Sequence, residues 1–380
     1  MAHIAQNSGF TTGYTTTDGI YINNTVMMEG DTTGPSSAEY ILKDPTVEFA
    51  VLETARGGLL RNGMAFSNAD IGIITNIKED HLGLNDIHTL EDLAQVKSVV
   101  VHNVKKDGWA ILNAEDEHCV KIAEELECNV AFFSLDEENE LIQKLCSEGR
   151  TVAVYENGYL TIKQGNKKIR IANVHSVPLT MDGKVKFMIA NALAATLAAY
   201  QWGFSAKQIA SSLETFVPGY EQTPGRMNMF ELKRYNVLVD YAHNPHGYAA
   251  VQDYIKNIGA RRKIGIISGV GDRRDEDIRE CAYLAGCMFD HIIIRQDEDL
   301  RGRTEEAITK LLVEGLAKCG RMVTYETISD EEHATRHALD IAEEGDFIIA
   351  LTEKIDVAVG VIKEQLAREE RENEKFQQSA

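Results

Sequence analysis

A glutamate directly follows an apolar run early in the chain, in the sequence Glu53-Thr54-Ala55-Arg56-Gly57-Gly58. The run before it, residues 47–52, reads Val-Glu-Phe-Ala-Val-Leu and predicts a strand. Open α/β sheets bind ligands at the carboxyl ends of their strands. A carboxylate at that place is suited to hold Mg²⁺ against a nucleotide. The sequence therefore predicts a metal-assisted site at Glu53.

A second polar loop, Asn76 to Leu82, follows the next apolar run, Ile71–Thr75. In this loop His81 offers an imidazole, and Asp80 offers a carboxylate that could orient a metal ligand. An ordinary capped turn would use the same residue types. Two candidate ligands after consecutive strands are less expected by chance than one, which favours a shared metal site.

The loop Asp240-Tyr241-Ala242-His243-Asn244-Pro245 follows the apolar run Val237–Val239 and precedes a predicted helix. An aspartate at this point can accept hydrogen bonds from a ribose, and the histidine or asparagine can reach a phosphate. The same residues also suit a helix that Asn244 caps and in which Pro245 occupies the first turn. From this motif alone the two interpretations are equally supported.

Three further polar segments accompany these loops. Pro224-Gly225-Arg226 lies at a predicted domain junction, where a guanidinium could bridge a nucleotide to both domains. Gly269–Asp275 and Asp297–Arg303 each follow an apolar run and predict loops along one edge of a second sheet. A glycine after a strand is a weak signal by itself.

Composition limits the functional classes. The 380 residues suffice for two or three domains, and 44% hydrophobic and 26% charged residues are typical of soluble globular proteins. The formal net charge of −20 argues against binding to nucleic acid or an anionic membrane. The basic runs 167–170 and 261–263 are short and predict solvated faces. The six cysteines form no Cys-x-x-Cys pair, and no signal peptide or membrane-length apolar span is evident, so a cytoplasmic protein is expected.

The elements that must position these loops alternate between strand and helix, which predicts mainly parallel sheets. The first domain, 1–222, is expected to be doubly wound, with an antiparallel ribbon over Thr151–Ile171. The second, 223–365, is expected to be Rossmann-like, and the tail 366–380 is expected to be a frayed helix end or disordered. The predicted strands are Val47–Leu52, Ile71–Thr75, Trp109–Leu112, Val130–Phe133, Val237–Asp240, Lys263–Ile267, His291–Ile294, Met322–Tyr325 and Asp346–Ala350.

Taken together, the motifs resemble those of the ATP-dependent Mur ligases, and within that family they are most similar to the Mur-like part of the cyanophycin synthetases. The similarity reaches from Met1 to about Lys363 and rests on the loops Asp31–Pro35, Glu53–Gly58, Asn76–Leu82, Pro224–Arg226 and Asp240–Pro245. The resemblance implies an α/β fold with a central doubly wound parallel sheet and a C-terminal Rossmann-like domain. It also implies ligase chemistry, in which ATP converts an aspartate side-chain carboxylate of the polymer into an acyl phosphate and the amine of arginine attacks it.

The resemblance assigns roles to individual residues. Glu53 and His81 would hold Mg²⁺, and Lys97 matches the lysine that is carbamylated in many Mur ligases. An exposed helix lysine remains the alternative for Lys97. Nucleotide contacts are implied for Asn76, Arg226, Asp240, His243 and Asn244. Substrate contacts are implied for Thr32, Thr33, Arg56, Asp297, Glu298, Asp299, Arg301 and Arg303, with the acidic triplet 297–299 facing the guanidinium of arginine.

The sequence departs from the family pattern at one place. Family members carry a Gly-x-x-Gly-Lys-Thr type loop whose N–H groups and lysine hold the phosphates, and no such loop occurs in these 380 residues. The chain is expected to begin inside the helix that follows this loop, so that the first strand of the central sheet is also missing. Low stability or low activity of the chain alone is the expected consequence.

Three hypotheses follow from the sequence. The favoured one is a fragment of a cyanophycin-synthetase-like ligase, whose partners would be an Asp-Arg polymer primer, arginine and the missing N-terminal part, with homo-oligomers left open. The second is a non-catalytic Mur-like module that binds polymer or partner. The third is another Mur-type ligase that acts on cell-wall peptide or folate.

Overall fold

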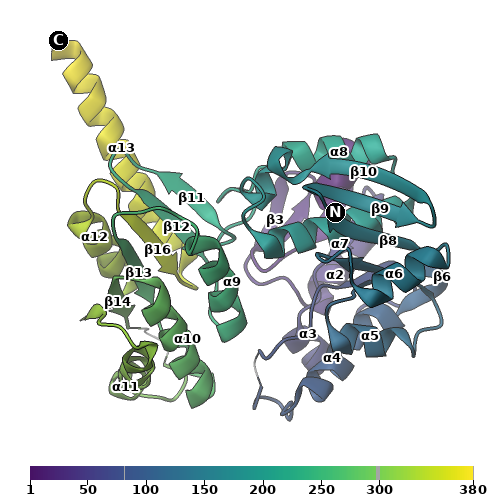
Figure 1. The fold of residues 1–380 in the computed structure, drawn as a ribbon, viewed down its shortest axis with the longest axis horizontal. Coiled ribbons are helices and arrows are strands. Elements are labelled where there is room, and N and C mark those ends of the chain that lie inside the picture. Colours follow the sequence, from purple (N-terminus) through teal and green to yellow (C-terminus); the bar gives the residue numbers. More distant parts are fainter. Residues whose placement is uncertain (81, 297–299, 380) are drawn as a thin grey trace. The chain divides into compact units, whose positions relative to one another are not determined.

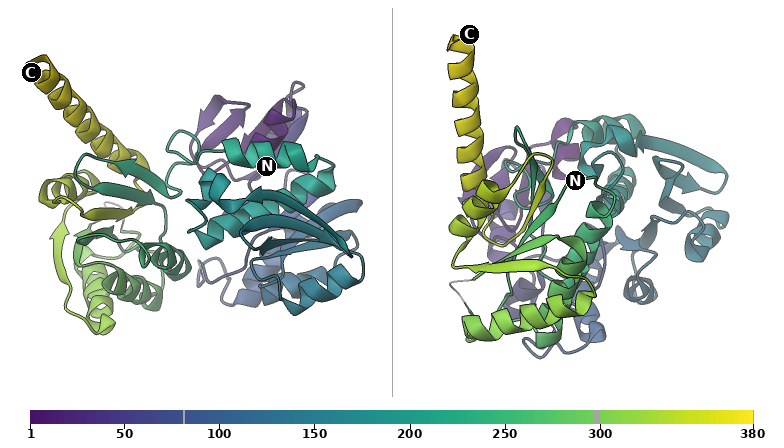
Figure 2. Two further views of the ribbon diagram at one scale, coloured as in Figure 1. Left: turned by 45° about the horizontal axis from the view of Figure 1, so that its top comes forward. Right: turned by 60° about the vertical axis from the view of Figure 1, so that its left-hand side comes forward.

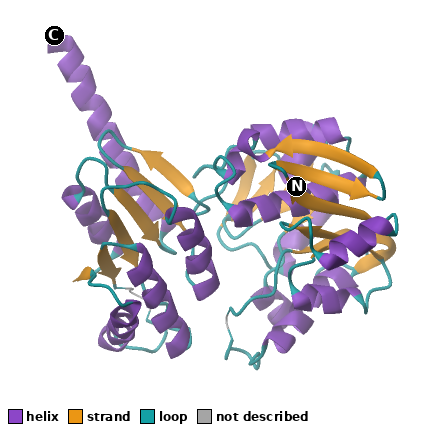
Figure 3. Ribbon diagram, in the orientation of Figure 1, coloured by secondary structure: helices purple, strands orange, loops and turns teal. Residues whose placement is uncertain are grey.

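The computed structural model describes residues 1–80, 82–296 and 300–379, and the chain forms two compact units, Met1–Val217 and Pro218–Ala380 (Figure 1). Each unit is an α/β domain with its own sheets and helices, as Figure 3 shows by colour. Among the described residues, none of the helices has the length and apolar character needed to span a bilayer.

The first unit begins with a four-stranded sheet in the order β3-β2-β1-β4. Strands β1, β2 and β3 form antiparallel hairpins, and β4 joins β1 in parallel. Their bounds are β1 Thr12–Thr15, β2 Gly19–Ile22, β3 Thr25–Glu29 and β4 Phe49–Leu52. Helices α1 (Ala2–Asn7) and α2 (Pro35–Lys43) pack against this sheet, and α3 (Arg56–Asn62) follows β4.

A six-stranded sheet in the order β10-β9-β8-β7-β6-β5 completes the first unit. Strands β5 to β8 pair in parallel, and β8, β9 and β10 form the antiparallel ribbon that the sequence predicts at the edge of the sheet. The bounds are β5 Ala69–Ile74, β6 Val104–Asn113, β7 Asn129–Ser134, β8 Thr151–Glu156, β9 Tyr159–Gln164 and β10 Lys167–Asn173.

Helices cover both faces of this sheet. On one face lie α4 (Leu90–His102), α5 (Glu117–Ala123) and α6 (Glu140–Ser147); on the other lies α7 (Lys186–Trp202), with α8 (Ala206–Thr215) beside it. The burial of α7 follows from its composition, because its Ala-rich sequence is apolar on all sides. Figure 2 shows the layers from two further directions.

The predicted strands of the first unit are present, but they do not form one sheet. β4 ends the four-stranded sheet and β5 ends the six-stranded sheet, and no pairing joins β4 to β5 in the described part of the chain. One core nevertheless spans both sheets, since Phe49 and Val51 of β4 pack in the same cluster as Ile71 and Ile73 of β5. Apolar burial therefore holds the two sheets together without a hydrogen-bonded ladder between them.

The second unit has one six-stranded sheet in the order β11-β12-β16-β13-β14-β15, parallel except for β11. Helices α9 and α10 pack together, α10 also packs on α11, and α12 and α13 cover the opposite face. The bounds are β11 Asn228–Glu231, β12 Asn236–Asp240, α9 Pro245–Ile255, β13 Lys263–Ile267, α10 Asp275–Met288, β14 His291–Arg295, α11 Glu305–Leu316, β15 Thr324–Ile328, α12 Glu331–Ile341, β16 Phe347–Leu351 and α13 Ile355–Ser379.

Helix α13 runs from Ile355 to Ser379, so residues 366–379 continue a helix in the segment for which the sequence predicts a frayed helix end or disorder. Part of this segment contacts the rest of the unit: the Lys233 N–H donates to Glu369 at 2.9 Å. Gln365 also donates to Glu369 one turn later, at 3.4 Å. Such contacts and the residues of high helix propensity in this segment favour helix over disorder.

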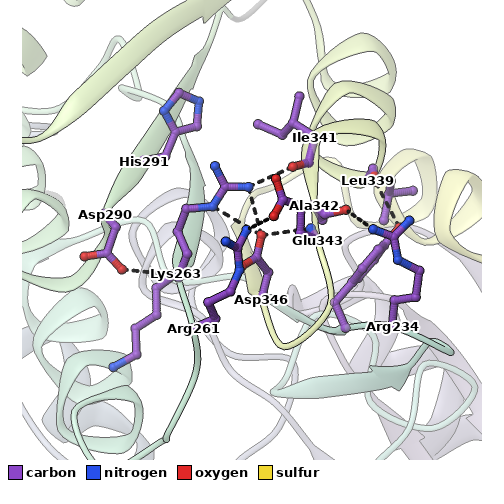
Figure 4. Close-up of polar contacts among 12 residues, drawn as sticks. Arg234, Arg261, Lys263, Asp290, His291, Leu339, Ile341, Ala342, Glu343 and Asp346 are labelled. Carbon is purple, nitrogen blue, oxygen red and sulfur yellow. Dashed lines mark hydrogen bonds and ion pairs between the residues drawn. The ribbon is translucent and has the colours of Figure 1, made fainter.

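Two residues of the basic run 261–263, Arg261 and Arg262, form a structural cluster around Asp346 (Figure 4). The Asp346 carboxylate is 2% exposed and accepts hydrogen bonds from Arg261 Nε at 3.1 Å and from Arg262 Nη2 at 2.8 Å. The Glu343 N–H donates to the same carboxylate at 2.9 Å. The cluster lies where β13 and β16 begin, so these arginines join strand ends and are not solely a solvated face.

Candidate active site

Glu53 lies at the end of β4, where its side chain is exposed. Its backbone N–H donates to the Thr15 hydroxyl at 3.2 Å, which ties the loop to the neighbouring strand β1. The Ala55 N–H donates to the Thr33 carbonyl at 3.2 Å. A carboxylate held by its backbone and presented to solvent is the arrangement predicted for a metal ligand at a strand end.

Thr32 and Thr33 are 3% and 4% exposed, and both hydroxyls bond within the protein. Thr32 Oγ1 donates to the Thr16 carbonyl at 2.7 Å, and Thr33 Oγ1 donates to Asp31 Oδ1 at 2.7 Å. Both hydroxyls are therefore satisfied within the protein, and their contact with substrate stays a prediction. Their role here is to shape the turn that supports the loop after β4.

Asn76, Lys97 and Arg56 come together around the loop after β5. Lys97 Nζ donates to the Asn76 carbonyl oxygen at 3.4 Å, and Lys97 is half-buried on α4. Arg56 is the first residue of α3 and acts electrostatically on Lys97. The structure therefore brings together three predicted site residues that lie 20 to 41 positions apart in the sequence.

Lys97 is not the exposed lysine of the alternative interpretation. Burial lowers its pKa below the ordinary value, the charges of Asp80, Cys119 and Asp116 oppose this shift, and the charge of Arg56 adds to it. A lowered pKa increases the fraction of neutral amine, which is the form that reacts with CO₂ or other electrophiles.

His81 lies outside the described residues, so its place beside Lys97 and Glu53 stays a prediction. Within the described residues no group of three His, Cys, Asp or Glu side chains could hold a metal ion.

In the second unit, the Asp240 carboxylate accepts hydrogen bonds from the protein's own backbone. It is 8% exposed, its Oδ2 accepts from the Met227 N–H at 2.9 Å, and its Oδ1 accepts from the Ala242 N–H at 2.9 Å. Burial raises the pKa of Asp240 to about 6, although these two hydrogen bonds and the charge of Arg226 act in the opposite direction. Asp240 therefore positions the loops around it, and its contact with a nucleotide stays a prediction.

Arg226, Tyr241 and His243 form a group on the loops that Asp240 holds. The Arg226 guanidinium lies 4.8 Å from the centre of the Tyr241 ring, and His243 packs edge-on against the same ring at 5.2 Å. His243 Nδ1 lies 2.9 Å from the Tyr241 carbonyl, so Nδ1 carries the proton. Asn244 caps α9 by accepting from the Gly247 N–H at 2.8 Å, which favours the capping interpretation for this residue.

The loops after β13 and β14 are locked together by two arginines. Arg303 donates to the carbonyls of Gly271 and Arg273, both at 2.8 Å, and pairs with Asp275 at 2.6 Å. Arg301 pairs with Asp272 at 2.5 Å. The guanidinium of Arg303 therefore bonds within the protein, and its contact with substrate stays a prediction. Asp297, Glu298 and Asp299 lie outside the described residues.

Sequence reasoning missed two polar residues at the site, Asn113 and Asp116. Asn113 Nδ2 donates to the Thr75 carbonyl at 3.0 Å, and Asp116 Oδ2 accepts from the Ile77 N–H at 2.8 Å. Both residues therefore contact the loop that carries Asn76. The available signal was a polar turn directly after the predicted strand Trp109–Leu112, in the same position as the two loops that were singled out.

The sequence matches family models over both units. The Mur ligase middle domain matches residues 1–199, and the Mur ligase glutamate ligase domain matches residues 225–352. The chain therefore belongs to the Mur ligase family, and the α/β fold predicted for it is confirmed.

The chain is similar to individual proteins of this family over most of its length. The chain is 46% identical over 363 residues to a cyanophycin synthetase from Nostoc sp., a match that covers 96% of this chain and 40% of that protein. It is 24% identical over 361 residues to a UDP-N-acetylmuramoyl-L-alanyl-D-glutamate–L-lysine ligase from Staphylococcus aureus, covering 92% of this chain and 68% of that protein. A solved bifunctional folylpolyglutamate synthase/dihydrofolate synthase with Mn, AMPPNP and L-glutamate bound has a TM-score of 0.69 at 17% identity, over 96% of this chain and 85% of that one. The chain thus spans about 40% of the length of the cyanophycin synthetase it matches.

Proposed function

We propose that the chain is the Mur-type part of an ATP-dependent ligase that adds arginine to the aspartate side chains of a cyanophycin-like polymer. In this reaction the γ-phosphoryl group of ATP passes to a side-chain carboxylate, releasing ADP. The α-amine of arginine then attacks the acyl carbon, so that the amide bond forms, phosphate leaves and the amine loses a proton. The observation that carries the proposal is the 46% identity with a cyanophycin synthetase over nearly the whole chain.

The residues present fit this chemistry in part. Glu53 supplies the hard oxygen ligand that Mg²⁺ prefers, and Mg²⁺ would neutralise charge on the phosphates. Asn76 lies on a loop whose backbone is held from three sides, and Lys97 contacts the same loop. A glycine-rich loop with Lys-Thr or Lys-Ser does not occur in the 380 residues, so these residues do not form a phosphate cradle of that type.

Lys97 is expected to carry a carbamate. Its buried amine with a lowered pKa would react with CO₂, and the resulting carboxylate would lie beside the Asn76 loop. Mass spectrometry of the intact chain in bicarbonate should find a mass increment of one CO₂ that Lys97→Arg abolishes and that Lys144→Arg, on α6, retains. Mg²⁺-dependent ADP binding by Lys97→Arg should fall about 10- to 100-fold, as for other groups that support metal ligands. Equal binding by the Lys97→Arg and Lys144→Arg chains would contradict this role.

The substrate assignment is tested with the purified chain, ATP, Mg²⁺, an aspartate-backbone primer and labelled arginine. We expect arginine incorporation with one ADP released per arginine, and little incorporation of lysine or glutamate. Titration of ADP with and without Mg²⁺ accompanies the assay, because it measures nucleotide binding independently of turnover. Preferential incorporation of another amino acid would instead support a different Mur-type ligase. Primer binding without any nucleotide binding would support a non-catalytic module.

A further inference from the structure

The loop after β5 is held at three consecutive residues by side chains from other elements. The Thr75 carbonyl accepts from Asn113 Nδ2 at 3.0 Å, and the Asn76 carbonyl accepts from Lys97 Nζ at 3.4 Å. The Ile77 N–H donates to Asp116 Oδ2 at 2.8 Å. Asn113 is the last residue of β6 and Asp116 lies in the turn after it, so this end of β6 fixes the backbone on both sides of Asn76.

Asp116 uses both of its oxygens. Oδ1 accepts from the N–H groups of His118 and Cys119, at 3.1 and 3.2 Å, and so caps α5. Oδ2 accepts from Ile77 and lies 3.5 Å from Lys78 Nζ. The residue is 1% exposed. A carboxylate so deeply buried is tolerated because hydrogen bonds and an ion pair compensate for the lost hydration.

A simple helix cap does not need this arrangement. Serine, threonine or asparagine would accept from the first N–H groups of α5 equally well, and such caps need not be buried. The second carboxylate oxygen is what reaches across to the loop after β5. Its contact joins two strand-end turns that are 39 positions apart in the sequence.

We infer that Asp116, together with Asn113, is a positioning residue that holds the Asn76 loop and the neighbouring Lys97 amine in their working arrangement. The charge of Asp116 acts on Lys97 directly, alongside the charges of Asp80, Cys119 and Arg56. Cys119 also lies within the electrostatic reach of Asp116 and Lys97. Burial and then the charge of Asp116 raise the pKa of its thiol to about 12, while the charge of Lys97 opposes this shift. The importance of this arrangement for nucleotide binding rests on the proposed function, whereas the loop contacts do not.

Two variants separate the loop contact from the helix cap. Asp116→Ser retains a cap for α5, but its side chain is too short to reach Ile77 and carries no charge. Asn113→Asp retains an acceptor for the Glu115 N–H, which now bonds Asn113 Oδ1 at 2.9 Å, and replaces the donor to Thr75 by a negatively charged oxygen. Ser205→Ala is the matched control, because it removes the cap of α8, where Ser205 accepts from the Gln208 N–H at 3.3 Å, and leaves the loop untouched.

Three measurements on the full chain test the inference. Hydrogen exchange over residues 71–80 should become faster in Asp116→Ser and Asn113→Asp and stay unchanged in Ser205→Ala. Labelling of Lys97 by an amine-reactive reagent should shift to lower pH in Asp116→Ser alone, because a charge that favours the ammonium is lost. Binding of Mg-ADP should weaken about 10- to 100-fold in both loop variants.

The outcomes distinguish this inference from the proposed function. If exchange and Lys97 labelling change but Mg-ADP binds to neither the native chain nor the variants, the positioning role stands and the nucleotide function fails. If the native chain binds Mg-ADP and both loop variants match Ser205→Ala in all three measurements, the positioning role is overturned. If Asp116→Ser does not fold, the positioning role is tested by hydrogen exchange and Mg-ADP binding of Asn113→Asp alone.

Discussion

Replacing Asp346 by alanine is expected to lower the free energy of unfolding of the C-terminal unit by about 3–5 kcal/mol, the usual cost of removing one partner from a buried charge pair. The carboxylate is 2% exposed and accepts from Arg261, Arg262 and the Glu343 N–H. Its removal leaves the Glu343 N–H without an acceptor where β16 begins. It also takes one acceptor from each guanidinium group, although Arg261 keeps its pair with Glu343 and Arg262 keeps the Ile341 carbonyl. Both arginine side chains are partly exposed, at 49% and 31%, so hydration recovers some of this loss and favours the lower end of the range.

Unfolding of the two units can be followed separately by spectroscopy. Both tryptophans, Trp109 and Trp202, lie in the first unit, so tryptophan fluorescence follows that unit, and far-UV circular dichroism follows both. In a denaturant titration Asp346→Ala should shift the circular dichroism transition. Glu332→Gln is the matched control, since Glu332 forms an exposed pair with Arg336 at 2.9 Å that should contribute at most about 1 kcal/mol. A shift no larger than that of Glu332→Gln would refute the structural importance of Asp346.

The same replacement has a predictable pH dependence. Burial acts to raise the pKa of Asp346, but the Glu343 N–H and the guanidinium groups of Arg262 and Arg261 outweigh burial and lower the pKa below its ordinary value of 3.8. A carboxyl group with a lowered pKa in the folded state stabilises the fold fully at pH values above 3.8, and it loses this contribution as pH falls through the folded-state pKa. The difference between the native chain and Asp346→Ala should therefore be full at neutral pH and shrink in acid.

The sequence predicted well the parallel strands that are buried on both faces. Strand β15 is largely exposed, and it begins two residues and ends three residues later than the predicted strand Met322–Tyr325. Runs such as Val237–Val239 and residues 347–351 are continuously apolar, which is typical of parallel sheets, and they appear as β12 and β16. The hairpins β1 to β3 were not predicted. Their threonine- and glycine-rich sequence predicts turns locally, and β1 gains its second partner from β4, 37 positions later in the sequence.

Site residues were harder to predict where a polar side chain serves the protein itself. Arg303 lies in a loop whose composition predicts solvent exposure, yet it bonds to backbone carbonyls of Gly271 and Arg273, about 30 positions earlier. Asp240 looks like a ligand-binding aspartate at a strand end, but its two oxygens accept from Met227 and Ala242. Residue type and strand-end position are the same for a ligand contact and a loop contact, so only the three-dimensional arrangement separates the two.

If the chain catalyses the proposed arginine addition, Glu53→Gln is expected to reduce arginine incorporation by about 10²–10³-fold, the usual effect of removing one group that stabilises charge developing on a reacting centre. The change keeps the size of the side chain and removes its charge. Because Glu53 is exposed and its N–H is held by Thr15, the backbone of the loop should not move. Calorimetric titration of ADP at several Mg²⁺ concentrations should show that the Mg²⁺ dependence of binding is largely lost.

Glu39→Gln is the matched control for this experiment, because Glu39 is an exposed glutamate of α2 that pairs with Lys43 one turn away. Both variants lower the negative charge of the chain by one, so a general effect of net charge on nucleotide binding would appear in both. A selective loss in Glu53→Gln would place the metal at the end of β4. If the two variants bind Mg-ADP equally well, Glu53 is not a metal ligand, and the Mg²⁺ site must be formed by other residues.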